Sequence, residues 1–322
     1  MTQSEKKSNG GATPPLAIEL VSINKRFGDV HANKDVSLQV MAGHIHGIIG
    51  ENGAGKSTLV SILYGFYSAD SGSIKISGQE TLVRTSAHAI ANGIGMVHQH
   101  FMLVPNFTVL ENVMLGHEGS LSVETATVAT RSALQKLSDD FGLAVDPDMI
   151  VEDLPVGLQQ RVEILKALFR GAKILILDEP TGVLTPQETE QLFDILRALR
   201  KQGVTVLLIT HKLKEIMAIT DDVSVMRGGE MVAHRQTAQT SPAELAELMV
   251  GRKVLLQVDH TPAKPTAPVL VITNLCLANA TGAANLKDIS LTLKAGEIVG
   301  VAGVSGNGQT ELLDVLSGIT PP

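Results

Sequence analysis

Short apolar runs alternate with amphipathic segments along most of this chain. The runs are rich in Val, Ile and Leu and show little alternation, which is typical of strands buried on both faces of a parallel sheet. Between them lie stretches with helical spacing, as in the apolar stripe of Leu192, Ile195, Leu196 and Leu199. Strands that alternate with helices predict a layered α/β fold.

The pattern gives approximate bounds for these elements. Strands are expected over residues 17–23, 36–40, 44–49, 74–76, 95–97, 174–177, 205–209 and 223–226. Helices are expected after Lys56, over 123–141, after Gly157, over 187–201 and over 242–249. Residues 1–15 are polar and contain Gly and Pro, so we expect a disordered leader there.

The chain also repeats itself at one constant spacing. The stretch KDISL at 287–291 repeats KDVSL at 34–38, 253 residues earlier. Three glycines keep the same spacing, since Gly303, Gly306 and Gly308 repeat Gly50, Gly53 and Gly55. A repeat without gaps predicts a duplicated domain. We therefore expect one α/β domain over 16–255, a proline-bearing linker over 256–268 and a partial second copy over 269–322.

Composition narrows the class of protein. Hydrophobic residues make up 44% of the 322, enough for a sizeable core, and the formal charge is −7. This acidity argues against a nucleic-acid binder that works by neutralising phosphates. A single cysteine, Cys276, excludes an internal disulfide and a cysteine-rich zinc site. No apolar run approaches the roughly 18 residues of a membrane span, so we expect no transmembrane segment.

The strongest local signal is the stretch GENGAGKST at residues 50–58. It follows an apolar run, precedes a helical pattern and fits the phosphate-binding loop G-x-x-x-x-G-K-[ST]. Lys56 is expected to reach the β- and γ-phosphates of a nucleotide, and the Ser57 hydroxyl to ligate Mg²⁺. The expected nucleotide contacts are Gly50, Asn52, Gly53, Ala54, Gly55, Lys56, Ser57 and Thr58. The alternative is a glycine-rich turn with a surface lysine.

Two carboxylates follow the buried strand expected at 174–177. Asp178 and Glu179 come directly after four apolar residues, at the end of a strand where open α/β sheets place their ligands. Asp178 is suited to hold Mg²⁺, and Glu179 to polarise a water molecule that attacks the γ-phosphate. Beside a phosphate loop, this pair favours a nucleotide hydrolase over an ordinary polar strand end.

Together these motifs resemble the nucleotide-binding subunit of ATP-binding cassette (ABC) transporters, over about residues 16–322. The resemblance implies a glutamine that contacts Mg²⁺ or water, a switch histidine that contacts the γ-phosphate and an aromatic residue under the adenine. These places are occupied by Gln99, His211 and Phe27. Read singly, they are also compatible with a loop amide, a surface histidine and a core hydrophobe.

One segment departs from the family pattern. The family has a signature sequence, usually L-S-G-G-Q, whose helix start faces the nucleotide of a second cassette. Here the segment reads Leu154, Pro155, Val156, Gly157, Leu158 and Gln159. Pro155 has neither a hydroxyl nor a backbone N–H, so two phosphate donors are missing. We expect a weakened signature that supports hydrolysis poorly.

The repeated loop also departs from the pattern, since Gln309 stands where Lys56 stands in the first copy. A neutral amide does not replace that charge on the phosphates. Degenerate second loops resemble those of the tandem-cassette importers of sugars and nucleosides. Residues 97–104 and 162–168 look closest to the nucleoside branch, with simple sugars as the alternative. The repeat leads us to expect a second cassette that is truncated at its C-terminal side.

The resemblance implies a peripheral protein on the cytoplasmic face of the plasma membrane. It would bind and hydrolyse Mg-ATP and thereby energise separate membrane permease subunits, to which a substrate-binding protein delivers the cargo. A second cassette would complete the ATP site. Residues 101–115 are expected to dock on the permease, although core packing is an equal alternative. The alternative is that the chain is an ATP-binding fragment or a regulatory protein that hydrolyses little ATP. A soluble DNA-repair or translation ATPase fits less well, because no coiled-coil or basic insertion is visible.

Two H-x-H pairs, His44/His46 and His98/His100, raise the question of a metal site. On a strand each pair would share one face, as metal ligands can. No nearby cysteine or third ligand completes either pair. We therefore interpret them as packed or surface histidines.

Overall fold

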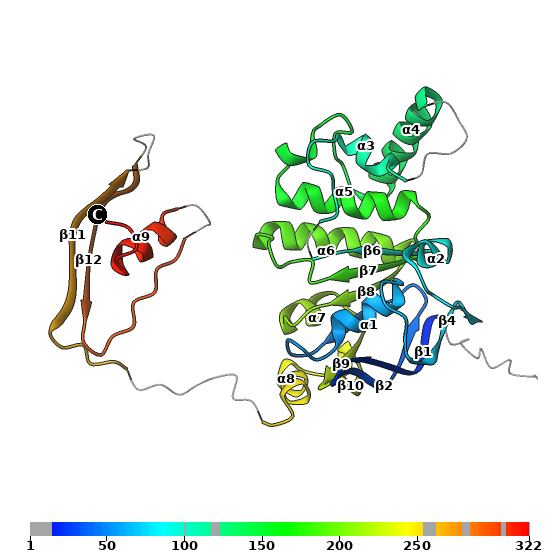
Figure 1. Cartoon of the computed structure of the whole chain (residues 1–322), viewed down its shortest axis with the longest axis horizontal. Helices are drawn as coiled ribbons and strands as arrows, with labels where there is room; N and C mark the ends of the chain where they lie inside the picture. Colours follow the sequence, from blue (N-terminus) through cyan, green and yellow to red (C-terminus); the bar gives the residue numbers. More distant parts are fainter. Residues whose placement is uncertain are drawn as a thin grey trace, which may run out of the picture. The chain divides into compact units, whose positions relative to one another are not determined.

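A computed structural model describes residues 15–99, 101–116, 123–253, 262–278, 284–303 and 307–321. The predicted leader, except residue 15, and residues 256–261 of the predicted linker lie outside these ranges. The chain divides into two units, Met1–Val254 and Leu255–Pro322, which we describe separately. Figure 1 shows the elements of both.

A six-stranded sheet forms the centre of the first unit. Its order is β10-β9-β3-β8-β7-β6, and all neighbouring pairs are parallel except β9 with β10. The strands are β3 (Ile45–Ile49), β6 (Ile94–Val97), β7 (Ile174–Asp178), β8 (Thr205–Ile209), β9 (Asp222–Arg227) and β10 (Glu230–Gln236). The predicted α/β fold is confirmed, and β10 is a strand that the apolar pattern did not reveal.

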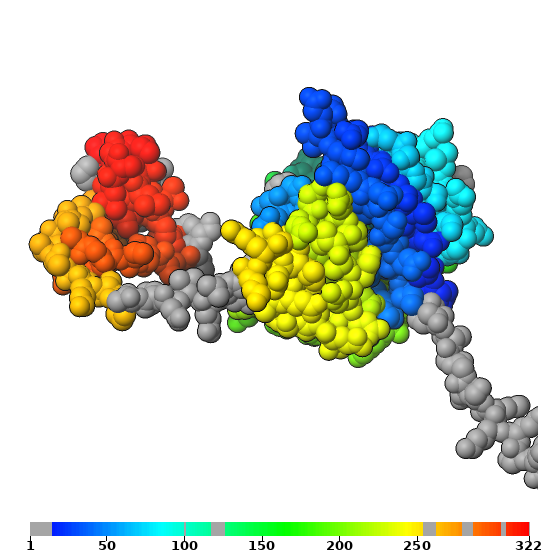
Figure 2. Space-filling view, turned by 90° about the horizontal axis from the view of Figure 1, so that it is seen from below, coloured from blue at the N-terminus to red at the C-terminus, as the bar shows by residue number. Residues whose placement is uncertain are grey.

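A second, antiparallel sheet lies beside the first. Its order is β2-β1-β4-β5, formed by β1 (Leu16–Phe27), β2 (Val30–Met41), β4 (Ser71–Ile76) and β5 (Gln79–Glu80). The pairing of β1 with β2 shifts register between Leu20 and Ile23, where Ser22 has a φ of 52°. In Figure 2, β1 and β2 (blue) and the region of β9, β10 and α8 (Pro242–Val250; yellow) share one face of the unit.

Helices and the antiparallel sheet cover the two faces of the central sheet. One face, which includes Leu175 and Leu177, packs against α3, α4, α5 and α6. The opposite face, which includes Ile174 and Ile176, packs against α1 and the antiparallel sheet. This double burial explains why the central strands are continuously apolar. The helices are α1 (Lys56–Leu63), α2 (Ser86–Ala91), α3 (Val109–Met114), α4 (Val123–Phe141), α5 (Val156–Phe169), α6 (Pro186–Lys201), α7 (Leu213–Ile219) and α8 (Pro242–Val250).

The second unit contains a long antiparallel hairpin and one helix in its described residues. The hairpin pairs β11 (Pro268–Ala278) with β12 (Ala284–Lys294), and α9 spans Gln309–Leu316. β11 thus begins at Pro268, the last residue of the predicted linker. Its register shifts between Ile272 and Leu275, and Asn274 has a φ of 51°. Among the described residues of the chain, no helix combines the length and hydropathy needed to cross a membrane.

Candidate functional site

The loop between β3 and α1 is built on glycines that approach other backbone segments closely. A Cβ added at Gly50 would lie 2.4 Å from the carbonyl oxygen of Met226, and one at Gly55 2.3 Å from that of Ala32. Gly55 also has a φ of 97° and caps the N-terminus of α1. The loop is therefore held between β2 and β9 from behind, while Gly53, with no atom within 4 Å of such a Cβ, faces open space.

Lys56 is the first residue of α1 and folds back over this loop. Its Nζ donates to the carbonyl oxygens of Gly50, at 2.8 Å, and Glu51, at 3.0 Å, and the residue is only 6% exposed. Burial lowers the pKa of Lys56, while the carboxylates of Glu179 and Asp178 oppose that shift. The alternative of a surface lysine is therefore wrong. Backbone N–H groups at a helix start and this ammonium form an anion-binding environment.

Asp178 and Glu179 lie at the carboxyl end of β7. Burial raises the pKa of Asp178, the neighbouring charge of Glu179 raises it further, and Lys56 opposes both effects. Glu179 has a φ of 46°, which is uncommon for a residue with a side chain. Its backbone N–H donates to the carbonyl of Ile209 at 2.9 Å, so β8 holds it in this conformation.

His211 follows β8, which lies between β3 and β7 in the sheet. Its Nδ1 lies 3.0 Å from Oε1 of Glu179. The side chain is 47% exposed, so the rest of the ring remains accessible to a ligand. The structure therefore brings together four predicted residues at the carboxyl ends of the neighbouring strands β3, β8 and β7. They are Lys56, Asp178, Glu179 and His211.

Three further predicted contacts, Gln99, Ser57 and Phe27, lie at the surface, whereas Ala54 of the loop is buried. Gln99 is exposed just after β6, the strand next to β7, and therefore at the same edge of the sheet. Ser57 is exposed at the start of α1. Phe27 is 42% exposed at the end of β1, and its ring meets that of Tyr67 edge-on at 5.1 Å. The alternative that Phe27 is a core hydrophobe is wrong.

The signature segment forms the start of α5. Pro155 is the N-cap and has no side-chain cap, and its carbonyl accepts from the N–H groups of Leu158 and Gln159 at 2.9 and 3.1 Å. Gln159 also donates through Nε2 to the carbonyl of Leu154 at 2.9 Å. Gly157 sits so close to α6 that an added Cβ would lie 2.7 Å from Oε1 of Glu188.

Glu188 is a residue that sequence reasoning missed. Its carboxylate accepts from the backbone N–H and hydroxyl of Thr185 in a capping box of α6. These bonds lower the pKa of Glu188, and its Oε1 lies against Gly157 at the start of α5. A carboxylate of the same chain thus stands beside the start of the signature helix. The T-x-x-E spacing indicates the cap, but nothing local indicates the contact with α5.

Oxygen donors at the sheet edge suit Mg²⁺, which prefers carboxylate, hydroxyl, amide and water oxygens. Such donors are supplied by Ser57 at the start of α1, Gln99 just after β6 and Asp178 at the end of β7. Within the described ranges there is no cluster of three His, Cys, Asp or Glu side chains that could hold a metal by itself. The residues therefore fit a cation that is shared with phosphate and water rather than one enclosed by protein.

The histidines of the H-x-H pairs have other partners. Nδ1 of His44 lies 2.7 Å from Asp222, and Nε2 of His46 lies 2.7 Å from Oγ of Ser224, which in turn lies 2.7 Å from Nδ1 of His234. His98 packs its ring 5.4 Å from that of Phe66. His100 lies outside the described residues. His44, His46 and His98 are thus packed side chains, as the sequence predicts.

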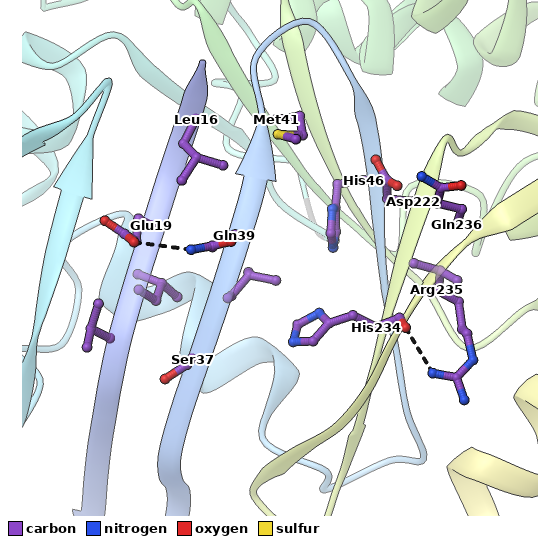
Figure 3. A pocket seen from close by; sticks show the side chains of 14 residues that line it. Leu16, Glu19, Ser37, Gln39, Met41, His46, Asp222, His234, Arg235 and Gln236 are labelled. Carbon is purple, nitrogen blue, oxygen red and sulfur yellow. Dashed lines mark hydrogen bonds between the residues drawn. The ribbon is translucent and has the colours of Figure 1, made fainter. Parts of the chain in front are cut away.

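A groove of about 600 Å³ opens beside His46 and His234, between β1 and β2 on one side and β9 and β10 on the other. Figure 3 shows His46 and His234 on one wall and Glu19 and Gln39 on the opposite wall. The residues predicted to contact a nucleotide do not line it. The groove is therefore separate from the phosphate loop.

The buried side chain of His46 should make the folding stability of the chain sensitive to acid. Burial, with smaller contributions from His234 and His44, lowers the pKa of His46 to about 4, and Asp222 opposes this shift. The unfolded chain therefore takes up the proton first, and stability falls between pH 6.5 and about 4. The expected slope approaches about 1.4 kcal/mol per pH unit. Urea unfolding at pH 7, 6 and 5 measures it, and His46→Gln should remove this part of the slope. An unchanged slope in His46→Gln would contradict the prediction.

Part of the chain matches one protein-family model. Residues 33–182 match the family model described as "ABC transporter". The nucleoside import ATP-binding protein NupA of Lactococcus lactis is 46% identical over 94% of this chain. The glucose import ATP-binding protein TsgD13 of Haloferax volcanii is 45% identical over 94% of it. The chain spans 60% of the length of each of these two proteins.

Solved structures agree with this match. The crystal structure of the ADP conformation of MJ1267, an ATP-binding cassette of an ABC transporter, is similar with a TM-score of 0.64 and 26% identity. The likeness covers 74% of this chain and 99% of that one. Nearly the whole of that cassette thus has its counterpart here.

Proposed function

We propose that the first unit of the chain is an ATP-binding cassette of the ABC transporter family, and that the chain binds and hydrolyses Mg-ATP as the ATP-binding subunit of an importer. The observation that carries the proposal is the meeting of Lys56, Asp178, Glu179 and His211 at the sheet edge, with Glu179 hydrogen-bonded to His211 at 3.0 Å. An anion-binding loop, a carboxylate base and a histidine are the parts that phosphoryl transfer to water requires.

Each predicted residue has a role in this proposal. The backbone of residues 50–58 binds the phosphates, and Lys56 exchanges its two carbonyl acceptors for phosphate oxygens. Ser57, Gln99 and Asp178 would hold Mg²⁺, which when bound neutralises charge on the β- and γ-phosphates. Exposed Phe27 supplies a face for the adenine.

Glu179 and His211 act on the attacking water in this proposal. The Glu179 carboxylate accepts a proton of the water, and it lies 3.0 Å from Nδ1 of His211. His211, held by Glu179 through Nδ1, presents its other ring nitrogen toward the γ-phosphate. His211 thereby links the position of the base to the presence of the phosphate.

Pro155 limits the signature helix. In a pair of cassettes, α5 of one chain would face the nucleotide of the other. At this helix start Pro155 has no N–H, and the carboxylate of Glu188 lies beside Gly157. We predict that Pro155→Ser raises ATP hydrolysis up to about tenfold, because a hydrogen bond to a charged group contributes about 1.5 kcal/mol. Steady-state phosphate release measures the effect.

A matched variant separates the two donors that Pro155 lacks. Pro155→Ala restores the backbone N–H without a hydroxyl, so its activity should lie between those of the original chain and Pro155→Ser. Equal or lower activity in both variants, with folding unchanged, would show that Pro155 does not limit the signature.

We further propose that the second unit is a partial second copy of the cassette. Its hairpin resembles that of β1 and β2, since Ile272 pairs with Leu291 as Leu20 pairs with Leu38. The N–H of Asn274 donates to Oγ of Ser290 at 3.0 Å, as that of Ser22 donates to Oγ of Ser37 at 3.0 Å. Gly308 caps α9 with a φ of 93°, close to the 97° of Gly55 before α1.

The second phosphate loop lacks the lysine in this proposal. The Gln309 side chain lies over Gly303, where an added Cβ would be 2.0 Å from its Nε2, much as Lys56 covers Gly50. Gly306 lies outside the described residues. An amide carries no charge for the phosphates, so we assign ATP hydrolysis to the loop of the first unit alone.

The proposed cargo is a nucleoside, with a simple sugar as the alternative. The names of NupA and TsgD13 give nucleoside and glucose import for those two proteins. The partners would be permease subunits, a substrate-binding protein and a second cassette, with the chain on the cytoplasmic face of the plasma membrane. Permease contact is assigned to residues 101–115, where Met102 is 61% and Leu115 41% exposed, whereas Leu103 packs against the core.

Two measurements test the proposal. Calorimetric titration should give saturable ATP binding that weakens when Mg²⁺ is removed, and phosphate release per chain should rise with protein concentration as cassettes pair. Tight binding without hydrolysis at any concentration would favour an ATP-binding or regulatory fragment instead. Absence of binding at millimolar ATP would contradict both functions.

Gene deletion tests the cargo. In the organism that makes this chain, deletion should lower uptake of tritiated uridine more than uptake of labelled glucose. The reverse result would assign a sugar.

A further inference from the structure

A buried carboxylate lies behind the candidate catalytic residues. Glu215 is in α7 and is only 6% exposed. Its Oε1 accepts from the hydroxyl of Thr181 and lies 3.3 Å from Nζ of Lys212, and its Oε2 accepts from the hydroxyl of Thr210 at 3.0 Å. A buried charge is tolerated when it is paired and hydrogen-bonded in this way. The two threonines are themselves 3% and 1% exposed, so the network is closed to solvent on this side.

This network joins the two loops that carry the catalytic pair. Thr181 follows Glu179 by two residues, and Thr210 directly precedes His211. Lys212 strengthens the connection, since its Nζ donates to the carbonyl and the hydroxyl of Thr181, both at 3.0 Å. Its backbone N–H donates to the hydroxyl of Thr210 at 3.0 Å. The loop after β7 is thus fastened to the loop after β8 through one carboxylate.

We propose that Glu215 is a positioning residue that fixes the spacing between Glu179 and His211. The proposal rests on the function proposed above for those two residues. Glu215 itself does not touch the substrate in it. Its two oxygens fix Thr181 and Thr210, and these fix the backbone from which Glu179 and His211 project. Glu179 needs such support because its backbone is in the left-handed region, with a φ of 46°.

The residue types suit this role. A hydroxyl has one hydrogen to donate, and each threonine gives it to Glu215, so both rotamers are fixed by the same acceptor. Without the carboxylate, two hydroxyls and the Lys212 ammonium lose a shared acceptor, and the two loops can separate. A glutamine of the same shape keeps one acceptor oxygen but carries no charge for Lys212. It should therefore hold the loops better than alanine and less well than glutamate.

The test compares Glu215→Ala and Glu215→Gln with the exposed-surface control Glu247→Ala on α8. In Glu215→Ala the kcat for ATP should fall between about tenfold and 100-fold, since small misplacements of reacting groups cost this much. The dissociation constant of Mg-ATP should stay within about twofold, because the phosphate loop is not part of the network. Glu215→Gln should recover part of the kcat, and Glu247→Ala should match the original chain.

A second readout needs no nucleotide. Hydrogen exchange measured by mass spectrometry should be faster in Glu215→Ala for peptides that cover residues 178–184 and 209–216, and unchanged for those that cover 50–58. An unchanged kcat in Glu215→Ala, or unchanged exchange in both loops, would overturn the proposal. If the original chain does not hydrolyse ATP, the proposed function fails, whereas the exchange result still decides whether Glu215 fastens the two loops. If Glu215→Ala does not fold, Glu215→Gln carries both readouts.

Discussion

Lys56→Ala is expected to weaken Mg-ATP binding by more than about 100-fold. The Lys56 ammonium opposes the rise in the pKa of Asp178, and its Nζ donates to the loop carbonyls of Gly50 and Glu51. Two charge-assisted hydrogen bonds to phosphate at about 1.5 kcal/mol each give about 3 kcal/mol, which corresponds to that change in Kd. Calorimetric titration with ATP and Mg²⁺ measures it directly.

Lys173→Ala is the matched control for this variant. Lys173 is exposed, and its replacement removes the same charge without touching the phosphate loop. The Kd of Mg-ATP should therefore stay within about twofold of the original. A thermal melt must show that Lys56→Ala folds, because the lost side chain also closes the loop. Binding by folded Lys56→Ala within tenfold of the original would show that the nucleotide does not sit on residues 50–58.

Glu179→Gln is expected to lower ATP hydrolysis by about 100-fold to 10,000-fold, the usual range for loss of a general base. Binding of Mg-ATP should persist, since the phosphate loop is untouched. The amide also removes a negative charge beside Asp178, whose pKa should then fall toward its ordinary value. Single-turnover phosphate release, measured together with the Kd of ATP, separates the lost chemical step from binding.

Glu190→Gln controls for charge alone. Glu190 is exposed on α6, so this variant removes one negative charge without touching the phosphate loop or the base. It should hydrolyse ATP within about twofold of the original rate. Turnover above one tenth of the original rate in Glu179→Gln would remove Glu179 from the role of base and leave His211 as the first alternative to examine.

Much of the site was predictable because its signals are local. The spacing of Gly50, Gly55 and Lys56 specifies a loop that only a strand and a helix can flank, and both are present. Asp178 and Glu179 were predictable because a run buried on both faces must end where polar residues begin. The parallel order of the strands then places the two motifs at one edge.

The residues that escaped prediction depend on contacts between distant segments. Glu215 lies in a helix of seven residues, too short for a periodic apolar stripe, and its partners come from two strands. Glu188 gives a capping signal for α6, but its contact with Gly157 depends on how α5 and α6 pack. β10 pairs at the edge of the sheet and mixes polar with apolar residues, so no buried run marks it.

The carboxylate of Glu188 at the start of α5 changes what any approaching phosphate encounters. In the proposed pair of cassettes, a phosphate brought to this helix would meet the Glu188 carboxylate, whose Oε1 would lie 2.7 Å from a Cβ added at Gly157. Repulsion between the two anions would reduce the energy gained from the attraction of the helix start. Since Glu188 belongs to the first turn of α6, its release would loosen the start of that helix. If two cassettes pair as proposed, the capping box at the start of α6 would therefore change in each chain.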